Sequence, residues 1–391
     1  MTAREVRPGL TWVGAIDWER RLFDSLIPTP QGTTYNAYLL RGSQRTVLLD
    51  TVDASCLPAL LDHLRGVDRV DDIVIHHVEQ DHSGSLPFIM ERYPEARVLI
   101  SPKGREMLLD HLRVDAGRVE TVEDGATLDV GGRTLRFLLA PWQHWPETMM
   151  THLSDDGVLF SCDLFGAHLA SAALYAPDGC VEGPARSYYA EIMMPFRNAI
   201  RRNLDRLEGL DIRVIAPSHG PLHDKPERIR TAYDTWVSGP PRNAAIVAYV
   251  SMHGSTREMV ERLLGALAER GVRTLGMDLT STNAGDLADA LVDAATLVMA
   301  TPTVLGGAHP LAVSAAYLAN ALKPKLLHVA VLGSFGWGGK TAQQIADLMS
   351  GVRAEVLPPV LTRGLPGDDD LAAVDQLASA IADRHAAAGL S

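Results

Sequence analysis

Cysteine is scarce in this sequence. Three cysteines, Cys56, Cys162 and Cys180, occur in 391 residues, and no two of them form a CxxC pair. An odd number of widely spaced cysteines argues against a disulfide framework, which is typical of small secreted domains. We therefore expect unpaired thiols and a cytoplasmic protein.

Long apolar runs and positive charge are also lacking. No uninterrupted apolar stretch approaches the roughly 18 residues of a membrane span, and the N-terminal segment shows no apolar signal core. A formal net charge of -12 argues against nucleic acid or an anionic membrane as a partner. At 391 residues, the chain is long enough for two domains.

A Gly-Pro-Pro run in "VSGPPRNAA", residues 237–245, marks the best domain boundary, because it can continue neither a helix nor a central strand. We expect one domain over residues 1–240 and another over 244–391. In the second, apolar runs such as "TLVMATPT" and "LLHVAVLGSFG" alternate with helical patterns. This alternation predicts a doubly wound parallel sheet.

The first part has a different pattern. "TYNAYLLRG" and "RTVLLDTVD" predict adjacent strands, whereas "LPALLDHLRG" predicts a helix before the strand "DIVIHH". Hairpin-like pairs mixed with βα units indicate packed sheets flanked by helices. Polar clusters follow several of the predicted strands, where sites in such folds tend to lie.

The densest polar cluster is "HHVEQDHSGS", residues 76–85. His77, Glu79 and Asp81 are spaced by two, so in an extended or loosely turned segment their side chains leave the chain on one side. His82 is then expected to open the helix "SLPFIMERY". Taken alone, the segment is compatible with an ordinary structural turn.

Three later segments supply further potential metal ligands. They are "APWQHWPETM" with His144, "LFSCDLFG" with Asp163, and "VIAPSHGP" with His219. Each is predicted to follow a strand. Any one of these residues alone would be compatible with a core histidine or a turn aspartate. Because all of them fall at predicted strand ends, coincidence is a poor explanation.

These segments together resemble the metallo-β-lactamase fold, whose hydrolases carry H-x-H-x-D-H and later His, Asp and His ligands. This chain has Glu79 in place of the second histidine. Three histidines and three carboxylates suit a di-iron centre better than a hydrolytic zinc pair. H-x-E-x-D-H, "HWPETM", "FSCDLFG" and "APSHG" resemble the flavodiiron proteins, which join such a domain to a flavodoxin-like one.

The resemblance implies an N-terminal αββα sandwich and a set of iron ligands. His77, Glu79 and His144 would hold one iron, Asp81 and His219 the other, and Asp163 would bridge the two. His82 would lie beside the site and orient a ligand. Many relatives carry a histidine where this chain has Asp24 and Ser25, and Tyr188 or Tyr189 is a candidate hydrogen-bond donor to the pocket.

Three glycine-rich loops predict a flavin site in the second domain. "SMHGSTREM" follows a predicted strand and opens a helix, where small residues and hydroxyls can bind a phosphate; helix capping is the alternative interpretation. No GK[ST] follows, as a P-loop NTPase would require. "TPTVLGGAHP" and "GSFGWGGK" complete the resemblance to the FMN loops of flavodoxin-like domains. The candidate FMN-binding residues are Ser251, Met252, His253, Gly254, Ser255, Thr256, Pro302, Thr303, Val304, Leu305, Gly306, Gly307, Ser334, Phe335, Gly336, Trp337, Gly338 and Gly339.

The resemblance implies an oxidoreductase that reduces dioxygen to water, nitric oxide to nitrous oxide, or both, with electrons arriving through FMN. The family assembles as head-to-tail homodimers or dimers of dimers, in which each flavin faces the partner's iron site. Because no CxxC pair exists, the electron donor is expected to be separate: rubredoxin, a flavin reductase or a reduced deazaflavin. The alternatives are a metal-dependent hydrolase fused to a flavodoxin-like module and an electron carrier without catalytic activity.

Overall fold

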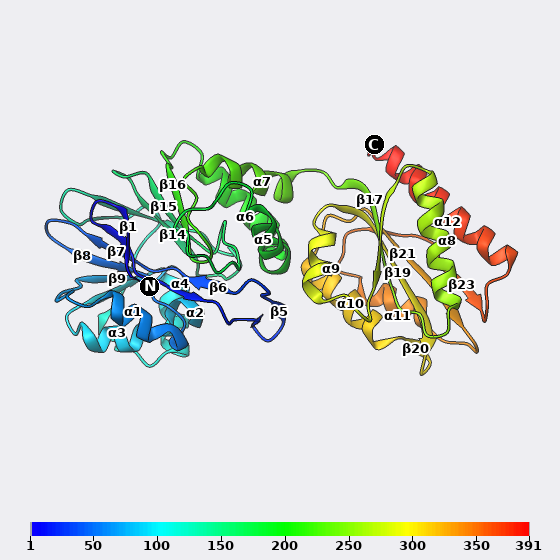
Figure 1. The fold of residues 1–391 in the computed structure, drawn as a ribbon, viewed down its shortest axis with the longest axis horizontal. Helices are drawn as coiled ribbons and strands as arrows, with labels where there is room; N and C mark the ends of the chain where they lie inside the picture. Colours follow the sequence, from blue (N-terminus) through cyan, green and yellow to red (C-terminus); the bar gives the residue numbers. More distant parts are fainter. Residues whose placement is uncertain (1, 391) are drawn as a thin grey trace. The chain divides into compact units, whose positions relative to one another are not determined.

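The computed structural model describes residues 2–390. The chain divides into two compact units. The first comprises the residues up to Ser25 and Thr29–Val237, and the second comprises Leu26–Pro28 and the residues from Ser238 on (Figure 1). Within the described residues, no helix has the length and apolar character needed to cross a membrane.

The first unit contains two facing sheets. One has seven strands in the order β1-β2-β7-β8-β9-β10-β11, and the other has five in the order β12-β13-β14-β15-β16. The strands are β1 (Arg4–Arg7), β2 (Leu10–Trp12), β7 (Tyr38–Arg41), β8 (Thr46–Leu49), β9 (Asp72–Val74), β10 (Arg97–Ile100), β11 (Val119–Thr121), β12 (Thr127–Asp129), β13 (Thr134–Leu139), β14 (Met149–Leu153), β15 (Val158–Cys162) and β16 (Val214–Pro217), with the short β3 (Ala15–Asp17), β4 (Leu22–Phe23) and β6 (Thr33–Tyr35) outside these sheets. The short β5 (Ile27–Pro28) falls in the stretch that is assigned to the second unit.

Helices cover the outer faces of the two sheets, which gives the expected αββα sandwich (Figure 1). The helices α1 to α4 lie on one side of the unit and α5 to α7 on the other. Their bounds are α1 (Leu57–His63), α2 (Gln80–Ser83), α3 (Leu86–Arg92), α4 (Pro102–His111), α5 (Glu182–Tyr188), α6 (Arg197–Arg206) and α7 (Pro226–Ser238).

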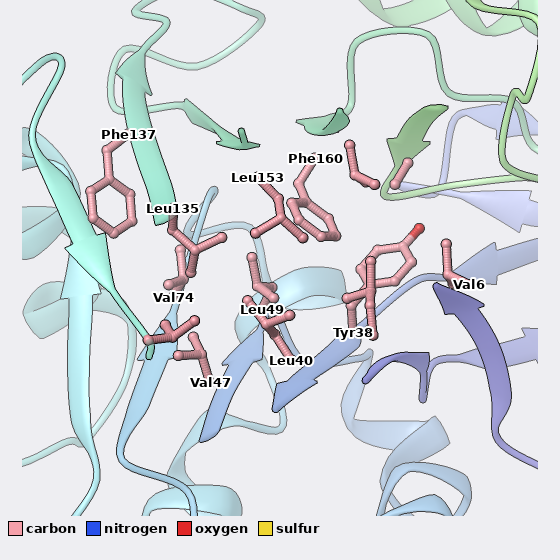
Figure 2. Close-up of a cluster of buried hydrophobic side chains, with 14 of the residues drawn as sticks. Val6, Tyr38, Leu40, Val47, Leu49, Val74, Leu135, Phe137, Leu153 and Phe160 are labelled. Atoms are coloured by element: carbon pink, nitrogen blue, oxygen red, sulfur yellow. The ribbon is translucent and has the colours of Figure 1, made fainter. Parts of the chain in front are cut away.

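Apolar side chains from both sheets fill the space between them. Figure 2 shows Leu135, Leu153 and Phe160 of the second sheet beside Leu40 and Leu49 of the first. All five are buried. Burial of apolar area on this scale supplies most of the stability of such a domain, and it gives the strand ends a rigid base.

The second unit is built on a parallel sheet with the strand order β18-β17-β19-β21 followed by β22 and β23. This is the flavodoxin-like order. In Figure 1, α8 and α12 lie on one face and α9, α10 and α11 on the other. The bounds are β17 (Arg242–Tyr249), β18 (Arg273–Asp278), β19 (Ala294–Val304), β20 (Gly307–Ala308), β21 (His328–Phe335), β22 (Glu355–Val356), β23 (Val360–Arg363), α8 (Ser255–Glu269), α9 (Ala284–Leu291), α10 (Pro310–Leu322), α11 (Thr341–Leu348) and α12 (Asp368–Ala387).

A buried histidine joins α12 to this sheet. The His385 Nδ1 lies 2.9 Å from Asn243 Oδ1, and its Nε2 lies 2.7 Å from Thr296 Oγ1. Because the Asn243 amide nitrogen donates to the Gly271 carbonyl, its oxygen faces the ring. The neutral ring therefore donates through Nδ1 and accepts through Nε2, which a second proton would prevent. Burial, aided by the neighbouring His328, lowers the pKa of His385 to about 4.

The lowered pKa of His385 makes a testable contribution to stability. Above pH 6.5, the ordinary pKa of a histidine, the folded and unfolded states both carry a neutral His385 ring. As the pH falls toward 4, only the unfolded state binds the proton, so the free energy of unfolding should fall, by at most about 2 kcal/mol between pH 7 and pH 5. Urea titrations of the second unit's transition should show this loss. His385→Gln, which keeps one donor and one acceptor but does not titrate, should reduce it; an unchanged pH dependence would contradict the assignment.

Candidate metal and flavin sites

The six predicted metal ligands and His82 come together in the first unit. His77 follows β9, His144 lies between β13 and β14, Asp163 directly follows β15, and His219 follows β16. These strands belong to both sheets. The site therefore lies at one end of the sandwich, where loops from the two sheets meet.

The side chains form two groups. Cluster one contains His77, Glu79 and His144: the Glu79 Oε2 lies 3.0 Å from the His77 Nε2 and 3.5 Å from the His144 Nε2. Cluster two contains Asp81, His82 and His219: the His219 Nε2 lies 3.1 Å from Asp81 Oδ2, and the His82 Nε2 lies 3.4 Å from Asp81 Oδ1.

Asp163 lies between the two clusters and directs one oxygen to each. Its Oδ2 is 3.2 Å from the His144 Nε2 and 3.8 Å from the His77 Nε2. Its Oδ1 is 3.2 Å from the His82 Nε2 and 3.4 Å from the His219 Nε2. A carboxylate with this placement can bind two metal ions at once, one through each oxygen.

The charges in the site are strongly coupled. Burial would raise the pKa of Asp163, but the charge of His82 and hydrogen bonds with His144 and His219 hold it well below its usual range. Burial would likewise lower the pKa of His219, but its contacts with Asp163 and Asp81 raise it to about 10. The carboxylates thus create a negative field that retains protons, and the same field attracts divalent cations.

The donor set fits metal ions better than it fits a network of hydrogen bonds. Both oxygens of Asp81 and the Nε2 of His82 are buried without a hydrogen-bond partner among the described residues. They lie within ion-pair distance of their neighbours but are not aligned with them for hydrogen bonding. Such atoms are costly to bury unless a ligand binds them. Histidine nitrogens and carboxylate oxygens are suitable ligands for iron.

The structure corrects two details of the H-x-E-x-D-H segment. Of the extended or turned forms considered for His77 to Asp81, the extended one is wrong, because Asp81 lies in the one-turn helix α2. His82 also lies in α2 and does not open the next helix, which begins at Leu86 after Gly84 and Ser85. The tight turn at Glu79 directs Asp81 and His82 to the second cluster, which strand alternation would not do.

Left-handed backbone conformations gather around this site. Within residues 2–390, nine residues other than glycine have positive φ, and such angles are uncommon and costly. Those in the segments that carry or adjoin the site are Asp24, Ser25, Asp50, Trp142, His144, Cys162 and Phe165. The φ of +64° at His144 itself indicates that the loop is held in a strained shape to direct its ring.

Other residues hold the proposed ligands in place. The Tyr188 hydroxyl donates to Asp163 Oδ1 at 3.0 Å, whereas Tyr189 donates to the Trp236 carbonyl and so belongs to the core. The His219 Nδ1 lies 2.7 Å from the Thr34 carbonyl oxygen. The His77 Nδ1 lies 2.6 Å from Glu147 Oε1. Sequence reasoning missed Glu147, although a carboxylate three residues after His144 was a visible signal.

A pocket of about 390 Å³ opens beside Glu79 and Asp81. Asp24 lines it together with Phe23 and Trp145. Burial, followed by the negative charges of Glu79 and Asp81, raises the pKa of Asp24 to about 6. The turn that contains Asp24 therefore brings a carboxyl group to the entrance of this site.

The predicted flavin loops meet at one edge of the second unit's sheet. The first loop follows β17. The other two begin within strands, because Pro302, Thr303 and Val304 lie in β19 and Ser334 and Phe335 lie in β21. The three strands are adjacent and parallel. Side chains join them: the Thr256 and Ser334 hydroxyls lie 2.9 Å apart, and those of Thr303 and Thr341 lie 2.7 Å apart. The Thr256 side chain is buried and its hydroxyl faces Ser334, whereas residues 251–255 of the same predicted loop are more exposed to solvent.

Two glycines of these loops, Gly307 and Gly339, are closely packed, and two apolar side chains of the loops are exposed. A Cβ on Gly339 would lie 2.7 Å from Thr303 Cγ2, so Gly339 lies too close to Thr303 to be replaced by a larger residue. Leu305 is fully exposed, and Trp337 is 83% exposed. Exposed aromatic and aliphatic groups around close-packed backbone are suitable for binding a planar ring, so the loops fit FMN.

The bridging position of Asp163 can be tested by metal analysis. Asp163→Ala should lower the metal content of both clusters, because it removes a ligand from each and leaves two cations with less negative charge between them. His219→Ala should affect mainly one metal. His223, a buried histidine outside the clusters that contacts the Phe165 carbonyl, provides a control as His223→Gln. Two metals per chain in Asp163→Ala would disprove the bridge.

Comparison with known proteins places the chain in a family. Residues 33–220 match the family model described as ODP family beta lactamase. The nitric oxide reductase of Moorella thermoacetica is 32% identical, over 97% of this chain and 98% of the relative. Among solved structures, rubredoxin oxygen:oxidoreductase of Desulfovibrio gigas is 29% identical with a TM-score of 0.94 and covers 98% of this chain and 99% of that one. The flavodiiron protein of Giardia intestinalis is 26% identical with a TM-score of 0.92, covering 99% and 97% respectively. With this sandwich and a flavodoxin-like sheet in one chain, and with a relative 32% identical over nearly the whole length of both proteins, the protein belongs to the flavodiiron family.

Proposed function

We propose that this protein reduces dioxygen to water, nitric oxide to nitrous oxide, or both, at a non-haem di-iron centre that receives electrons through FMN. The observation that carries the proposal is the position of Asp163, which directs one oxygen to each of two clusters of histidines and carboxylates. The family adds the redox chemistry, since its members include a nitric oxide reductase and an oxygen oxidoreductase.

The ligand set favours this function over hydrolysis. Glu79 stands where the related hydrolases have a histidine, and its oxygen lies within 3.5 Å of two histidine nitrogens. Three carboxylates among six ligands make the site more anionic than a histidine-rich zinc site. Such a site suits iron, which changes between two oxidation states. A metal-dependent hydrolase fused to a flavodoxin-like module is therefore the less favoured alternative.

The side chains of this chain have distinct tasks in such a reaction. Bound FMN can accept two electrons and release them singly, and two bound irons supply the coordination positions at which a gas is reduced. Asp163, Glu79 and Asp81 balance the metal charge, and the imidazoles direct their Nε2 atoms to it. The pocket beside Asp24 gives a small gas access to the site, while the buried surroundings limit the escape of reactive products.

We assign the di-iron domain to residues 1–240 and the FMN domain to residues 244–391. The flavin and the metals would thus be held by different parts of the chain. A head-to-tail homodimer, or a dimer of dimers, would place each flavin against the partner's metal site. The donor would be a separate protein or cofactor, such as rubredoxin, a flavin reductase or a reduced deazaflavin. A cytoplasmic location and the lack of nucleic-acid or membrane partners stay predictions from composition.

The proposed function is tested by metal analysis and gas consumption. The purified protein should contain iron in preference to zinc and, once reduced, should consume dioxygen or nitric oxide at an electrode. Glu79→His should shift the metal preference toward zinc and lower gas consumption at least about 10-fold, the loss that follows even from disturbing a ligand's supporting residue. Stoichiometric zinc with full gas reduction would disprove the di-iron assignment.

The head-to-tail dimer is tested by combining two inactive variants. Asp163→Ala should lose metal but keep FMN. Gly254→Val should lose FMN but keep metal, because Gly254 has a φ of +97° that valine strongly disfavours. Random pairing makes half of the dimers mixed, and each mixed dimer has one intact pair of sites, so co-expression should restore about a quarter of the activity. If electrons passed within one chain, co-expression would restore none.

A further inference from the structure

Two of the three proposed histidine ligands, His77 and His219, have a partner at the second ring nitrogen, and these partners differ in charge. In cluster one, the His77 Nδ1 lies 2.6 Å from the carboxylate oxygen Oε1 of Glu147. In cluster two, the His219 Nδ1 lies 2.7 Å from the backbone carbonyl oxygen of Thr34. The lengths are nearly equal, but one acceptor is an anion and the other is a neutral amide.

Glu147 is held rigidly in this position. It is buried, with 2% exposure, and its Oε1 also accepts a hydrogen bond from the Val78 backbone N–H at 3.0 Å. Its own carbonyl accepts a hydrogen bond from the Ser101 hydroxyl at 2.6 Å. The residue directly precedes the segment leading into β14 of the second sheet, whereas His77 follows β9 of the first. Glu147 therefore fixes the His77 ring from the opposite sheet.

This contact has an electronic consequence. A neutral imidazole that donates from Nδ1 must present its lone pair at Nε2, the atom that faces Glu79 and Asp163. A carboxylate acceptor polarises the Nδ1–H bond more than a carbonyl does, because hydrogen bonds to ionised acceptors are stronger. Electron density at Nε2 rises accordingly, and the nitrogen becomes a stronger donor to a metal.

We propose that Glu147 is a positioning residue that makes the two metal positions unequal. Through His77 it strengthens metal binding at cluster one and stabilises the more highly charged state of an iron held there. An iron held in cluster two, which His219 and the neutral Thr34 carbonyl would support, would then be the first of the two to be reduced. This inference rests on the proposed function in that it takes cluster one and cluster two as the two metal positions.

The chain contains a matched pair that separates this role from simple packing. The His76 Nδ1 lies 2.6 Å from Asp50 Oδ2, and the Asp50 Oδ1 accepts from the His76 N–H. The His76 Nε2, however, faces the Thr151 hydroxyl at 2.8 Å. Asp50 and His76 thus form an equally buried carboxylate–histidine pair one residue away, but that histidine is not directed at a metal position.

Three variants test the proposal by titration of the metal-free full-length protein with Co²⁺, followed by its visible absorption. Glu147→Gln keeps an acceptor oxygen but removes the charge, so one of two binding steps should weaken about 10- to 100-fold, with the other little changed. Glu147→Asp keeps the charge and should bind more tightly than Glu147→Gln at that step. Asp50→Asn, at a left-handed position that asparagine tolerates, should leave both steps within about threefold, the scatter expected for a change outside the metal contacts.

A redox titration of the iron-loaded proteins gives a second readout. The later of the two iron reductions should move to a more positive potential in Glu147→Gln and stay in place in Asp50→Asn. Equal effects of Glu147→Gln and Asp50→Asn, equal binding by the Gln and Asp variants, or unchanged potentials would overturn the proposal. Cobalt binding needs no gas reduction, so a protein that reduced neither gas yet showed the predicted binding pattern would disprove only the proposed function.

Discussion

The site depends on the carboxylate of Asp163, which is buried between two groups of imidazoles. An isolated buried carboxylate would be very unfavourable, and four histidine rings within 3.8 Å of its two oxygens offset that cost. The arrangement requires the two oxygens to point in opposite directions toward ligands from different strands. The other ligands must reach this small region from different loops. Their positions therefore follow from the orientation of the two Asp163 oxygens.

The sandwich meets this requirement through rigid sheets and strained loops. Strands β9, β15 and β16 consist of buried residues, so their ends move little. The last turn toward the site is then made by residues in unfavourable conformations, such as Cys162 with a φ of +54° beside Asp163 and His144 with a φ of +64°. Packing between the sheets supplies the free energy that keeps these conformations populated.

Much of the fold and of the candidate site could be predicted from the sequence, because strand ends and ligand types are local properties. The apolar runs that became β15, β19 and β21 could be read directly, and so could the glycine loops that follow two of them. The path of Asp81 through α2 could not, because a one-turn helix leaves no periodic signal and depends on contacts made after folding. Glu147 was visible as a carboxylate three residues after His144, but its partner could not be inferred, because His77 lies 70 residues away.

The residues that hydrogen-bond to the ligands, more than the ligands themselves, therefore determine how this site differs from other sites with the same ligands. The same six ligands can be supported by charged or neutral acceptors, and the ligand motifs do not specify which. Here an anion supports His77 and an amide carbonyl supports His219, while Asp24 brings a further carboxyl group to the pocket. Since a gas reductase must pass electrons to two metals in sequence, an inequality built into the protein gives that sequence a direction. The ligand set explains which metals bind, and the acceptors that contact His77 and His219 explain how the two metal positions differ.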